Sequence, residues 1–280
     1  MWTAEHRRLA ARKGLRYPSD LTDGEWALVE PMIPPAKRGG RRREVNVREV
    51  LNAIFYVLST GCQWQALPKD LPPKSTAHHY FGLWDWDGTL ERLHHALYVE
   101  TRERAGREAS PSAAIIDSQS GKAAQKGGSA LDPQGFDAGK KVTGRTRHIL
   151  VDTLGLLLSV AVHPANVQDR DGAGEVLRTA RRSFPFIERI FADAGYQGPK
   201  MAKLVARTGH WSLQIVKRSD AHRFVVLPKR WIVERTFAWI SRNRRLARDF
   251  ERYSRTVAAF FRLAMIRIML RRLTRPTHSA

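Results

Sequence analysis

The 280-residue sequence has one cysteine, few acidic residues and no long apolar run. The lone cysteine, Cys62, excludes a disulfide framework and a cysteine-based zinc site. No apolar run approaches the roughly 18 residues that a membrane span requires, and the N-terminal residues lack the apolar region of a signal peptide. We therefore expect a cytoplasmic protein that has no membrane partner.

Acidic residues are scarce relative to basic ones. The sequence has 48 lysines and arginines against 27 aspartates and glutamates, a formal net charge of +21. The excess gathers in residues 37–48, 121–150 and 229–275. Three such clusters favour a surface that follows a phosphate backbone over ordinary solvated helix faces. Nucleic acid is the expected partner, and a hydrophobic fraction of 42% is sufficient for a folded core.

Residues 1–107 predict a small all-α domain. Thr22 and Glu25 form a capping-box pattern. Asn46 can cap a helix that ends at Gly61, and a shorter helix is expected from Ser75. Short helices around a tight turn suit a helix-turn-helix-like DNA-binding unit, in which the helix after Ser75 is the candidate reader of DNA sequence.

Residues 108–275 predict an α/β domain. Apolar runs predict strands at 113–117, 147–152, 156–162, 189–193 and 213–218. Helical patterns lie at about 170–182, after Pro228, and at 257–269, the last expected to be basic and amphipathic. Three antiparallel strands followed by crossover-connected ones give a mixed sheet with helices on its faces. Residues 118–140 are expected to form a loop.

Two aspartates each end an apolar run, Asp117 after the first predicted strand and Asp193 after the fourth. In an open sheet of this order the two strand ends can be neighbours at the switch point where ligands usually bind. Two like charges there are unfavourable unless a divalent cation lies between them. Oxygen ligands favour Mg²⁺ or Mn²⁺ over zinc, and Glu234 in the last part of the chain could close the same site.

Basic side chains accompany these acids. Arg230 and Arg245 fall on the helical face of Glu234 at i−4 and i+11, with Arg242 beside them. Such a face would let the acid hold a cation while the arginines hold a phosphate. Further contacts with the DNA backbone are expected from Lys140, Lys141, Arg145, Arg147 and His148. Three other aspartates are interpreted as turn or helix-start residues: Asp152, Asp169 and Asp171.

Long ordered strings carry a resemblance that covers nearly the whole chain: AIIDSQS, FDAGKKVTGRTRHILVDTLGLLLSVAVHPANVQDRDGA, FADAGYQG and VVLPKRWIVERTFAWISRNRRLARDFE. They resemble the DDE transposases of bacterial insertion sequences, insertion-sequence family five. The resemblance implies a ribonuclease-H-like fold and assigns the catalytic, metal-binding acids to Asp117, Asp193 and Glu234. In the last motif Arg230 fits the family pattern. Leu227 stands where the family has a tyrosine and Ser241 where it has a lysine.

The expected function is metal-dependent cleavage at the terminal inverted repeats of an insertion sequence, followed by transfer of the freed 3′-OH into target DNA. Two Mg²⁺ ions are the expected cofactors, with Mn²⁺ as a substitute. A homodimer on DNA is expected because two element ends are processed together, in the bacterial cytoplasm and on the nucleoid when DNA is bound. Two alternatives remain: a ribonuclease-H-like nuclease without strand transfer, and a catalytically inactive DNA-binding protein derived from a transposase.

Overall fold

The chain divides into two compact units. The computed structural model describes residues 12, 14–36, 39, 42–124, 132–216 and 230–275. One unit comprises residues 1–106 and 262–280, and the other residues 107–261. The sequence assigns residues up to 275 to the catalytic domain, but from Arg262 onward they group with the N-terminal helices. The reason lies in long-range bonds within that unit, since Arg104 donates to the carbonyl of Leu273 and Arg267 donates to that of Pro18.

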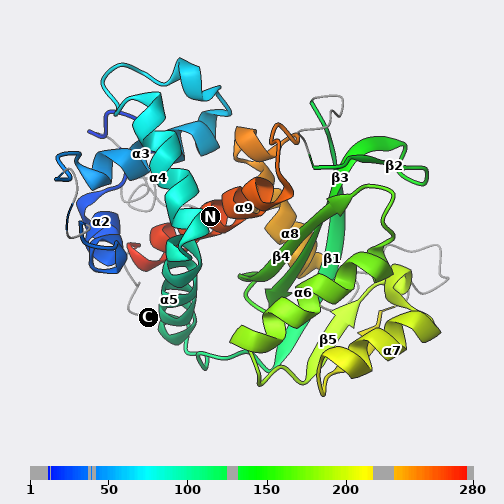
Figure 1. Ribbon diagram of the computed structural model, residues 1–280. Coiled ribbons are helices and arrows are strands. Elements are labelled where there is room, and N and C mark those ends of the chain that lie inside the picture. Colours follow the sequence, from blue (N-terminus) through cyan, green and yellow to red (C-terminus); the bar gives the residue numbers. More distant parts are fainter. Residues whose placement is uncertain are drawn as a thin grey trace, which may run out of the picture. The chain divides into compact units, whose positions relative to one another are not determined.

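The N-terminal unit is helical (Figure 1). Its helices before residue 107 are α2 (Asp23–Val29), α3 (Val47–Thr60), α4 (Lys74–Trp86) and α5 (Thr89–Arg104). The capping box at Thr22 and Glu25 is confirmed. The Asn46 side chain accepts from the backbone N–H groups at the start of α3, and Gly61 ends that helix with φ 71°. Helix α4 begins at Lys74, one residue before the position expected from the sequence.

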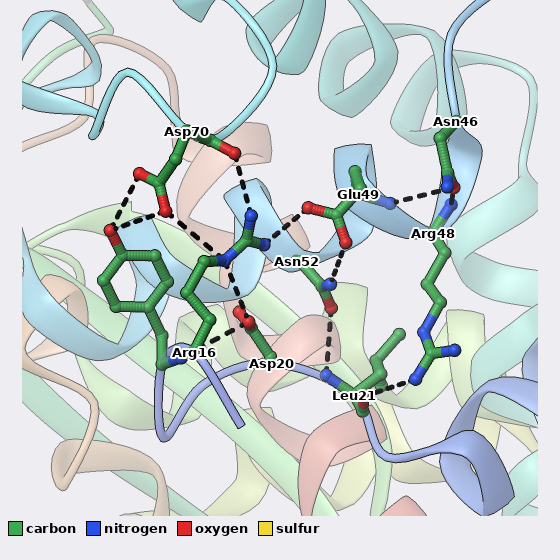
Figure 2. A network of polar contacts seen from close by, with 9 residues as sticks. Arg16, Asp20, Leu21, Asn46, Arg48, Glu49, Asn52 and Asp70 are labelled. Atoms are coloured by element: carbon green, nitrogen blue, oxygen red, sulfur yellow. Dashed lines mark hydrogen bonds and ion pairs between the residues drawn. The ribbon is translucent and has the colours of Figure 1, made fainter. Parts of the chain in front are cut away.

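A polar network joins the segment before α2 to helix α3 (Figure 2). Asn52, only 3% exposed, accepts a hydrogen bond from the Leu21 N–H at 2.9 Å and donates to Glu49 at 2.9 Å. Arg16 pairs with Glu49 and also with Asp70. Because buried polar atoms must find partners, the network fixes the path of residues 16–21 against α3.

The second unit contains a mixed sheet. Its strands are β1 (Ala113–Lys122), β2 (Gly135–Asp137), β3 (Val142–Asp152), β4 (Leu157–Pro164), β5 (Arg189–Ala192) and β6 (Ser212–Ile215). The order is β2-β3-β1-β5-β6, and β4 pairs with β3. Strand β3 is antiparallel to β1, β2 and β4, whereas β1, β5 and β6 are parallel. The expected α/β, ribonuclease-H-like mixed sheet is confirmed.

Two elements differ from the sequence expectation. Strand β1 continues through Lys122, and β2 lies inside the segment predicted to be a loop. The cause is pairing with β3, whose register with β1 runs from Asp152 opposite Ala114 to Gly144 opposite Lys122. The residues beyond Asp117 are too polar to predict a buried strand. Backbone hydrogen bonds to β3, rather than burial of an apolar face, therefore stabilise this part of β1 as a strand.

Helices cover both faces of the sheet. They are α6 (Asp169–Ser183), α7 (Pro199–Thr208), α8 (Arg230–Ser241) and the first part of α9 (Ser254–Leu273). Helix α6 packs on β3 and β4, and α8 packs on β1 and β3. Figure 1 shows α6 in front of the strands and α8 behind them. Thr236 of α8 donates its hydroxyl to the carbonyl of Gly155 at 2.8 Å, which anchors α8 to the turn between β3 and β4.

Helix α9 is not amphipathic. Its buried residues are consecutive, from Val257 to Phe261 and again from Leu263 to Ile266. A helix buried on all sides belongs to a protein interior rather than to a surface, so the expected basic amphipathic helix is wrong. Within the part of the chain that the structure describes, no helix has the length and apolarity to cross a bilayer.

Candidate active site

Strand pairing brings Asp117 and Asp193 together. The parallel register of β1 and β5 places Ala113 opposite Arg189 and Ile115 opposite Phe191. Continued two residues past its last pair, and one residue past the end of β5, this register would place Asp117 opposite Asp193. Adjacent strands lie roughly 5 Å apart, and aligned residues of parallel strands point to the same face. The parallel pairing of β1 with β5 therefore brings the two acids to neighbouring strands, and both line one pocket, as the sequence leads us to expect.

Both carboxylates are held by local backbone groups. Asp117 Oδ1 accepts from the Ser118 N–H at 2.8 Å. Asp193 follows the last residue of β5, and its Oδ1 accepts from the Gly195 N–H at 2.9 Å. The two acids line one small pocket together with Arg230. The sequence folds this way because β5 stops at Ala192, which leaves Asp193 free to cap the short turn that follows.

The pair is electrostatically strained. Burial raises the pKa of Asp117 to about 6, and the charge of Asp193 adds to this effect. The Ser118 N–H and the Arg230 guanidinium act in the opposite direction. A carboxylate that resists ionisation beside a second carboxylate is a position where a cation would be strongly bound.

Glu234 joins this pair through Arg230. The Glu234 side chain is 57% exposed on α8, and its Oε1 lies 3.2 Å from Arg230 Nε. A second nitrogen of the same guanidinium lies 3.5 Å from Asp193 Oδ2. The Arg230 guanidinium therefore lies between the carboxylate of Asp193, which follows β5, and that of Glu234 on α8. The structure gathers the three acids that the sequence singled out around this guanidinium.

The donor set fits a hard divalent cation. Among the residues that the structure describes, no group of three or more histidines, cysteines, aspartates or glutamates is arranged to hold a metal ion by itself. Mg²⁺ does not need such a cage, since one or two carboxylates, waters and substrate phosphates commonly bind it. Asp117 and Asp193 supply such a carboxylate pair, and Arg230 is the positive charge beside it.

Two arginines predicted to contact DNA are buried. Arg145 Nε forms an ion pair with Asp249 Oδ2 at 2.7 Å, and the side chains are 1% and 0% exposed. Arg147 donates to the carbonyl of Leu246 at 2.7 Å and lies over the ring of Phe261. Both guanidinium groups are occupied in tying β3 to residues from the C-terminal part of the unit. The prediction of DNA contacts is therefore wrong for these two residues.

His148 is likewise buried. A Cβ at Gly172 of α6 would come within 2.3 Å of the imidazole, so the glycine is needed for the close packing of α6 on β3. Burial lowers the pKa of His148 to about 3. A neutral, enclosed imidazole cannot contact a phosphate backbone, so this DNA contact is also wrong.

Arg245 departs from its predicted position because α8 ends at Ser241. The i+11 spacing from Glu234 therefore no longer describes a helical face. Arg245 is buried and donates to Glu251 at 2.6 Å, so its predicted role in holding phosphate is not supported. Arg242, just past the end of the helix, is exposed.

The remaining predicted DNA contacts are accessible. Lys140 and Lys141 lie at the tip between β2 and β3, and the Lys140 side chain is 44% exposed. Ser241 is exposed at the end of α8. Several sequence features fall outside the described residues, namely Leu227, the end of the strand predicted at 213–218, and residues 37, 38, 40 and 41 of the first basic cluster.

The sequence reasoning missed three residues beside the acids. Asp169, taken as a helix-start residue, does begin α6, but its Oδ1 also accepts from the Ser118 hydroxyl at 2.5 Å. Tyr196, three residues after Asp193, is fully buried near the same carboxylates. The sequence offers only positional hints for these residues. Asp169 begins the helix that follows β4, and Ser118 is next to Asp117 in the chain. This mixed sheet, with Asp117 in the middle of β1 and Asp193 just after the parallel strand β5, is that of a ribonuclease-H-like α/β domain with an acidic site.

Comparisons with known proteins agree with this class. The family model "Transposase DDE domain" matches residues 108–269, more than half of the chain. A second model, "Putative transposase of IS4/5 family", matches residues 21–94. The chain belongs to the DDE transposases of the IS4/5 type.

Two relatives come from Burkholderia cepacia. The "Insertion element IS402 uncharacterized 16.2 kDa protein" is 34% identical over 106 residues, which cover 36% of this chain and 71% of the relative. The "Putative transposase for insertion sequence element IS402" is 29% identical over 150 residues, which cover 49% of this chain and 67% of the relative.

Proposed function

We propose that this chain cleaves DNA at the terminal inverted repeats of its own insertion sequence and joins the freed 3′-OH ends to target DNA. The observation that supports the proposal is that Asp117 on β1 and Asp193, just after the neighbouring parallel strand β5, line one pocket with Arg230. Glu234 is linked to the same site through Arg230. Family membership supplies the transposase function, and the reaction steps are the proposal.

The three acids have one role, which is to hold divalent cations. We propose two Mg²⁺ ions, for which Mn²⁺ can substitute. When bound, such ions activate a water or a 3′-OH and stabilise the leaving oxygen of an in-line displacement. Asp117, Asp193 and Glu234 need not form a covalent bond with DNA, so the chain requires no serine or tyrosine nucleophile. Positioning and charge stabilisation then supply most of the rate.

Arg230 has a second role in this scheme. Its guanidinium now balances Asp193 and Glu234, so it competes with a cation for the same oxygens. With a cation held by these carboxylates, the Arg230 guanidinium would be available to a phosphate, which its fork of N–H donors suits.

DNA is the proposed partner of both units. Accessible basic side chains supply contacts to the backbone near the acids: Lys140, Lys141, Arg230 and Arg242. Such contacts give affinity that falls with salt and little sequence preference. We assign recognition of the terminal repeats to the N-terminal helices, with α4 as the candidate reader. A homodimer on DNA would process both element ends together, on the nucleoid of the bacterial cytoplasm.

A strand-transfer assay tests the proposal. Pre-cleaved DNA ends, taken from inverted repeats that flank the gene, are incubated with supercoiled plasmid and Mg²⁺ or Mn²⁺. The unaltered protein should join the ends to the plasmid, and Asp117→Asn, Asp193→Asn and Glu234→Gln should each abolish joining while DNA binding persists. The control is Asp171→Asn, an exposed acid on α6, which should leave joining intact.

The alternatives give different products. Metal-dependent cutting of the repeats without joining would identify a nuclease. Tight binding to the repeats without any cutting or joining would identify an inactive DNA-binding derivative. If joining persists in Asp117→Asn, the acids have a structural role and the proposal fails.

A further inference from the structure

Helix α7 presents a stripe of basic side chains on its outer side. The helix packs against α6 (Figure 1), and its residues Met201 and Val205 are buried. Three exposed cations lie on the opposite side of the helix, at i, i+3 and i+7: Lys200, Lys203 and Arg207. At roughly 100° per residue they fall within about 60° of one another, so they form one stripe.

Helix α6 adds two cations beside this stripe. Arg178 and Arg182 are exposed and lie one turn apart. A Cβ placed on Gly174 of α6 would lie 3.0 Å from Leu204 Cδ1 of α7 and 3.7 Å from Arg178 Nη1. The guanidinium of Arg178 therefore lies close to the contact between the two helices. We call the five cations together the α6–α7 face: Arg178, Arg182, Lys200, Lys203 and Arg207.

The α6–α7 face has little opposing charge. Helix α7 contains no acidic residue. Of the exposed acids on α6, Glu175 lies 2.9 Å from His163 of β4, which leaves Asp171. In the part of the chain that the structure describes, no acid forms an ion pair with any of the five cations. Like charges on one surface repel each other, so the face favours the binding of a polyanion.

Exposed arginines of the N-terminal unit have acidic partners. Arg16 pairs with Glu49 and Asp70, and Arg48 pairs with Asp23 at 2.7 Å. These arginines are neutralised within their own unit. The unbalanced charge of the α6–α7 face is therefore not a property of every basic position in the chain.

The α6–α7 face begins near the proposed site and extends away from it. Helix α7 starts at Pro199, shortly after Asp193 and the turn that it caps. A helix that connects two parallel strands runs back antiparallel to them, so Lys200 lies at the end of the sheet that carries Asp193. With a rise of about 1.5 Å per residue, Arg207 lies roughly 10 Å further along. A duplex held there would follow α7 over about three base pairs, at about 3.4 Å each.

The chemistry of the face suits a phosphate backbone rather than bases. Exposed lysines and arginines contact phosphates, which gives affinity with little sequence preference. The proposed function requires two DNA partners. The terminal repeats have to be recognised by their sequence, and we assign that role to the N-terminal helices. Target DNA instead requires a surface that binds duplexes of different sequence.

We infer that the α6–α7 face binds the target duplex through its phosphates. This inference deepens the proposed function and rests on it, because a target exists only if the chain joins DNA ends to one. It assigns a DNA contact to two helices that the acidic site does not use for phosphate.

Binding of a short duplex without the terminal repeats tests the inference, because it needs no catalysis. Each phosphate contact adds about 0.9 to the slope of log affinity against log salt. The triple variant Lys200→Ala, Lys203→Ala, Arg207→Ala of the full-length protein should therefore lower that slope by about 3. Between about 50 and 200 mM salt, the affinity of the unaltered protein should fall about 40-fold more than that of the variant.

The matched control compares Lys203→Ala with Arg189→Ala. Each removes one exposed positive charge from the same unit, but Arg189 begins β5, at the end of the sheet away from Asp193. Lys203→Ala should lower the slope by about 1, and Arg189→Ala should leave it unchanged. Alanine is a strong helix former, so the melting temperatures of the α7 variants should stay close to that of the unaltered protein. If the triple variant does not fold, the single variants Lys200→Ala, Lys203→Ala and Arg207→Ala decide, and an unchanged slope in all three overturns the inference.

Joining of pre-cleaved ends to plasmid gives a second measurement. The triple variant should bind a duplex of the terminal repeats as the unaltered protein does. It should join fewer ends at a given plasmid concentration and recover when more plasmid is added, because only target binding is weakened. Joining that additional plasmid does not restore would overturn the inference.

Two other results separate this inference from the proposed function. Equal weakening of binding to the repeats and to other DNA would overturn the inference, because the face would then hold the element ends. If the slope falls as expected but the unaltered protein joins no ends, the proposed function fails and DNA binding by the α6–α7 face is supported.

Discussion

Replacing Asp117 by asparagine should make the metal-free protein more stable while removing its activity. The pKa of this carboxyl is about 6 in the folded chain against an ordinary 3.8. Because a tenfold change in an equilibrium is worth about 1.4 kcal/mol, ionisation of Asp117 costs the folded state about 3 kcal/mol at neutral pH. Asparagine carries no charge, and its Oδ1 can still accept the Ser118 N–H that Asp117 accepts at 2.8 Å.

The sign of the pH dependence follows from the raised pKa. Above pH 6 the carboxyl is ionised in both states and the folded chain bears the full cost. Between pH 6 and 3.8 the folded state takes up its proton first, so the cost declines, and below 3.8 it is gone. The advantage of Asp117→Asn should therefore shrink from about 3 kcal/mol at pH 7.5 to about 1 kcal/mol at pH 4.5.

Urea unfolding in the presence of EDTA, followed by tryptophan fluorescence at both pH values, measures this difference. The matched control is Asp152→Asn, because Asp152 is fully buried and its Oδ1 accepts from the N–H groups of Leu154 and Leu156 at 2.9 and 2.8 Å. Weakening these charge-assisted bonds should lower stability by about 1 kcal/mol. A destabilised Asp117→Asn, or an advantage that does not change with pH, would refute the reasoning.

Three further predictions concern residues around the site. Asp249→Ala leaves Arg145 charged and buried, and should lower the free energy of unfolding by about 3–5 kcal/mol; a loss below about 1 kcal/mol in urea unfolding would contradict the buried ion pair. Gly172→Ala places a methyl group against His148 and should cost about 1–3 kcal/mol, so an unchanged melting temperature would count against the tight contact of α6 with β3. Arg242→Ala, at an exposed position, should reduce the slope of log affinity for DNA against log salt by about 1, and an unchanged slope would mean that this arginine does not contact phosphate.

The acidic pair could be predicted from sequence because each aspartate directly follows a short apolar run, although β1 continues beyond Asp117. Asp117 and Asp193 follow apolar runs, and a crossover connection makes such strands parallel. The parallel pairing of β1 with β5 then brings these two parts of the chain to neighbouring strands. The same reasoning could not show that β1 continues through Lys122, because long-range pairing with β3 stabilises that polar part of the strand.

The buried basic residues were misjudged for a physical reason. Arg145 and Arg147 lie two positions apart on β3, among the polar residues Thr146 and His148, a pattern that is also typical of an exposed strand. What buries them is a distant segment, with Asp249 and Leu246 supplying their partners about a hundred residues later. Charge alone indicates a polyanionic partner for the chain as a whole but does not say which arginines face it.

Asp169 escaped the sequence reasoning for a similar reason. Its place at the start of α6 was correctly interpreted, but a helix start explains only the local dipole. Its bond to Ser118 depends on how α6 packs against β3, and that packing depends on Gly172 fitting beside His148. No local pattern carries that information.

Iron-directed cleavage of the polypeptide tests most directly whether the three distant acids meet at one cation. With hydrogen peroxide and ascorbate added, Fe²⁺ bound in place of Mg²⁺ reduces the peroxide to hydroxyl radicals that cut nearby backbone, and excess Mg²⁺ should suppress the cuts by competition. The account predicts cuts close to Asp117, Asp193 and Glu234 in the same sample, all lost in Asp117→Asn. Cuts at one of these positions without the others, or cuts that excess Mg²⁺ does not suppress, would contradict it.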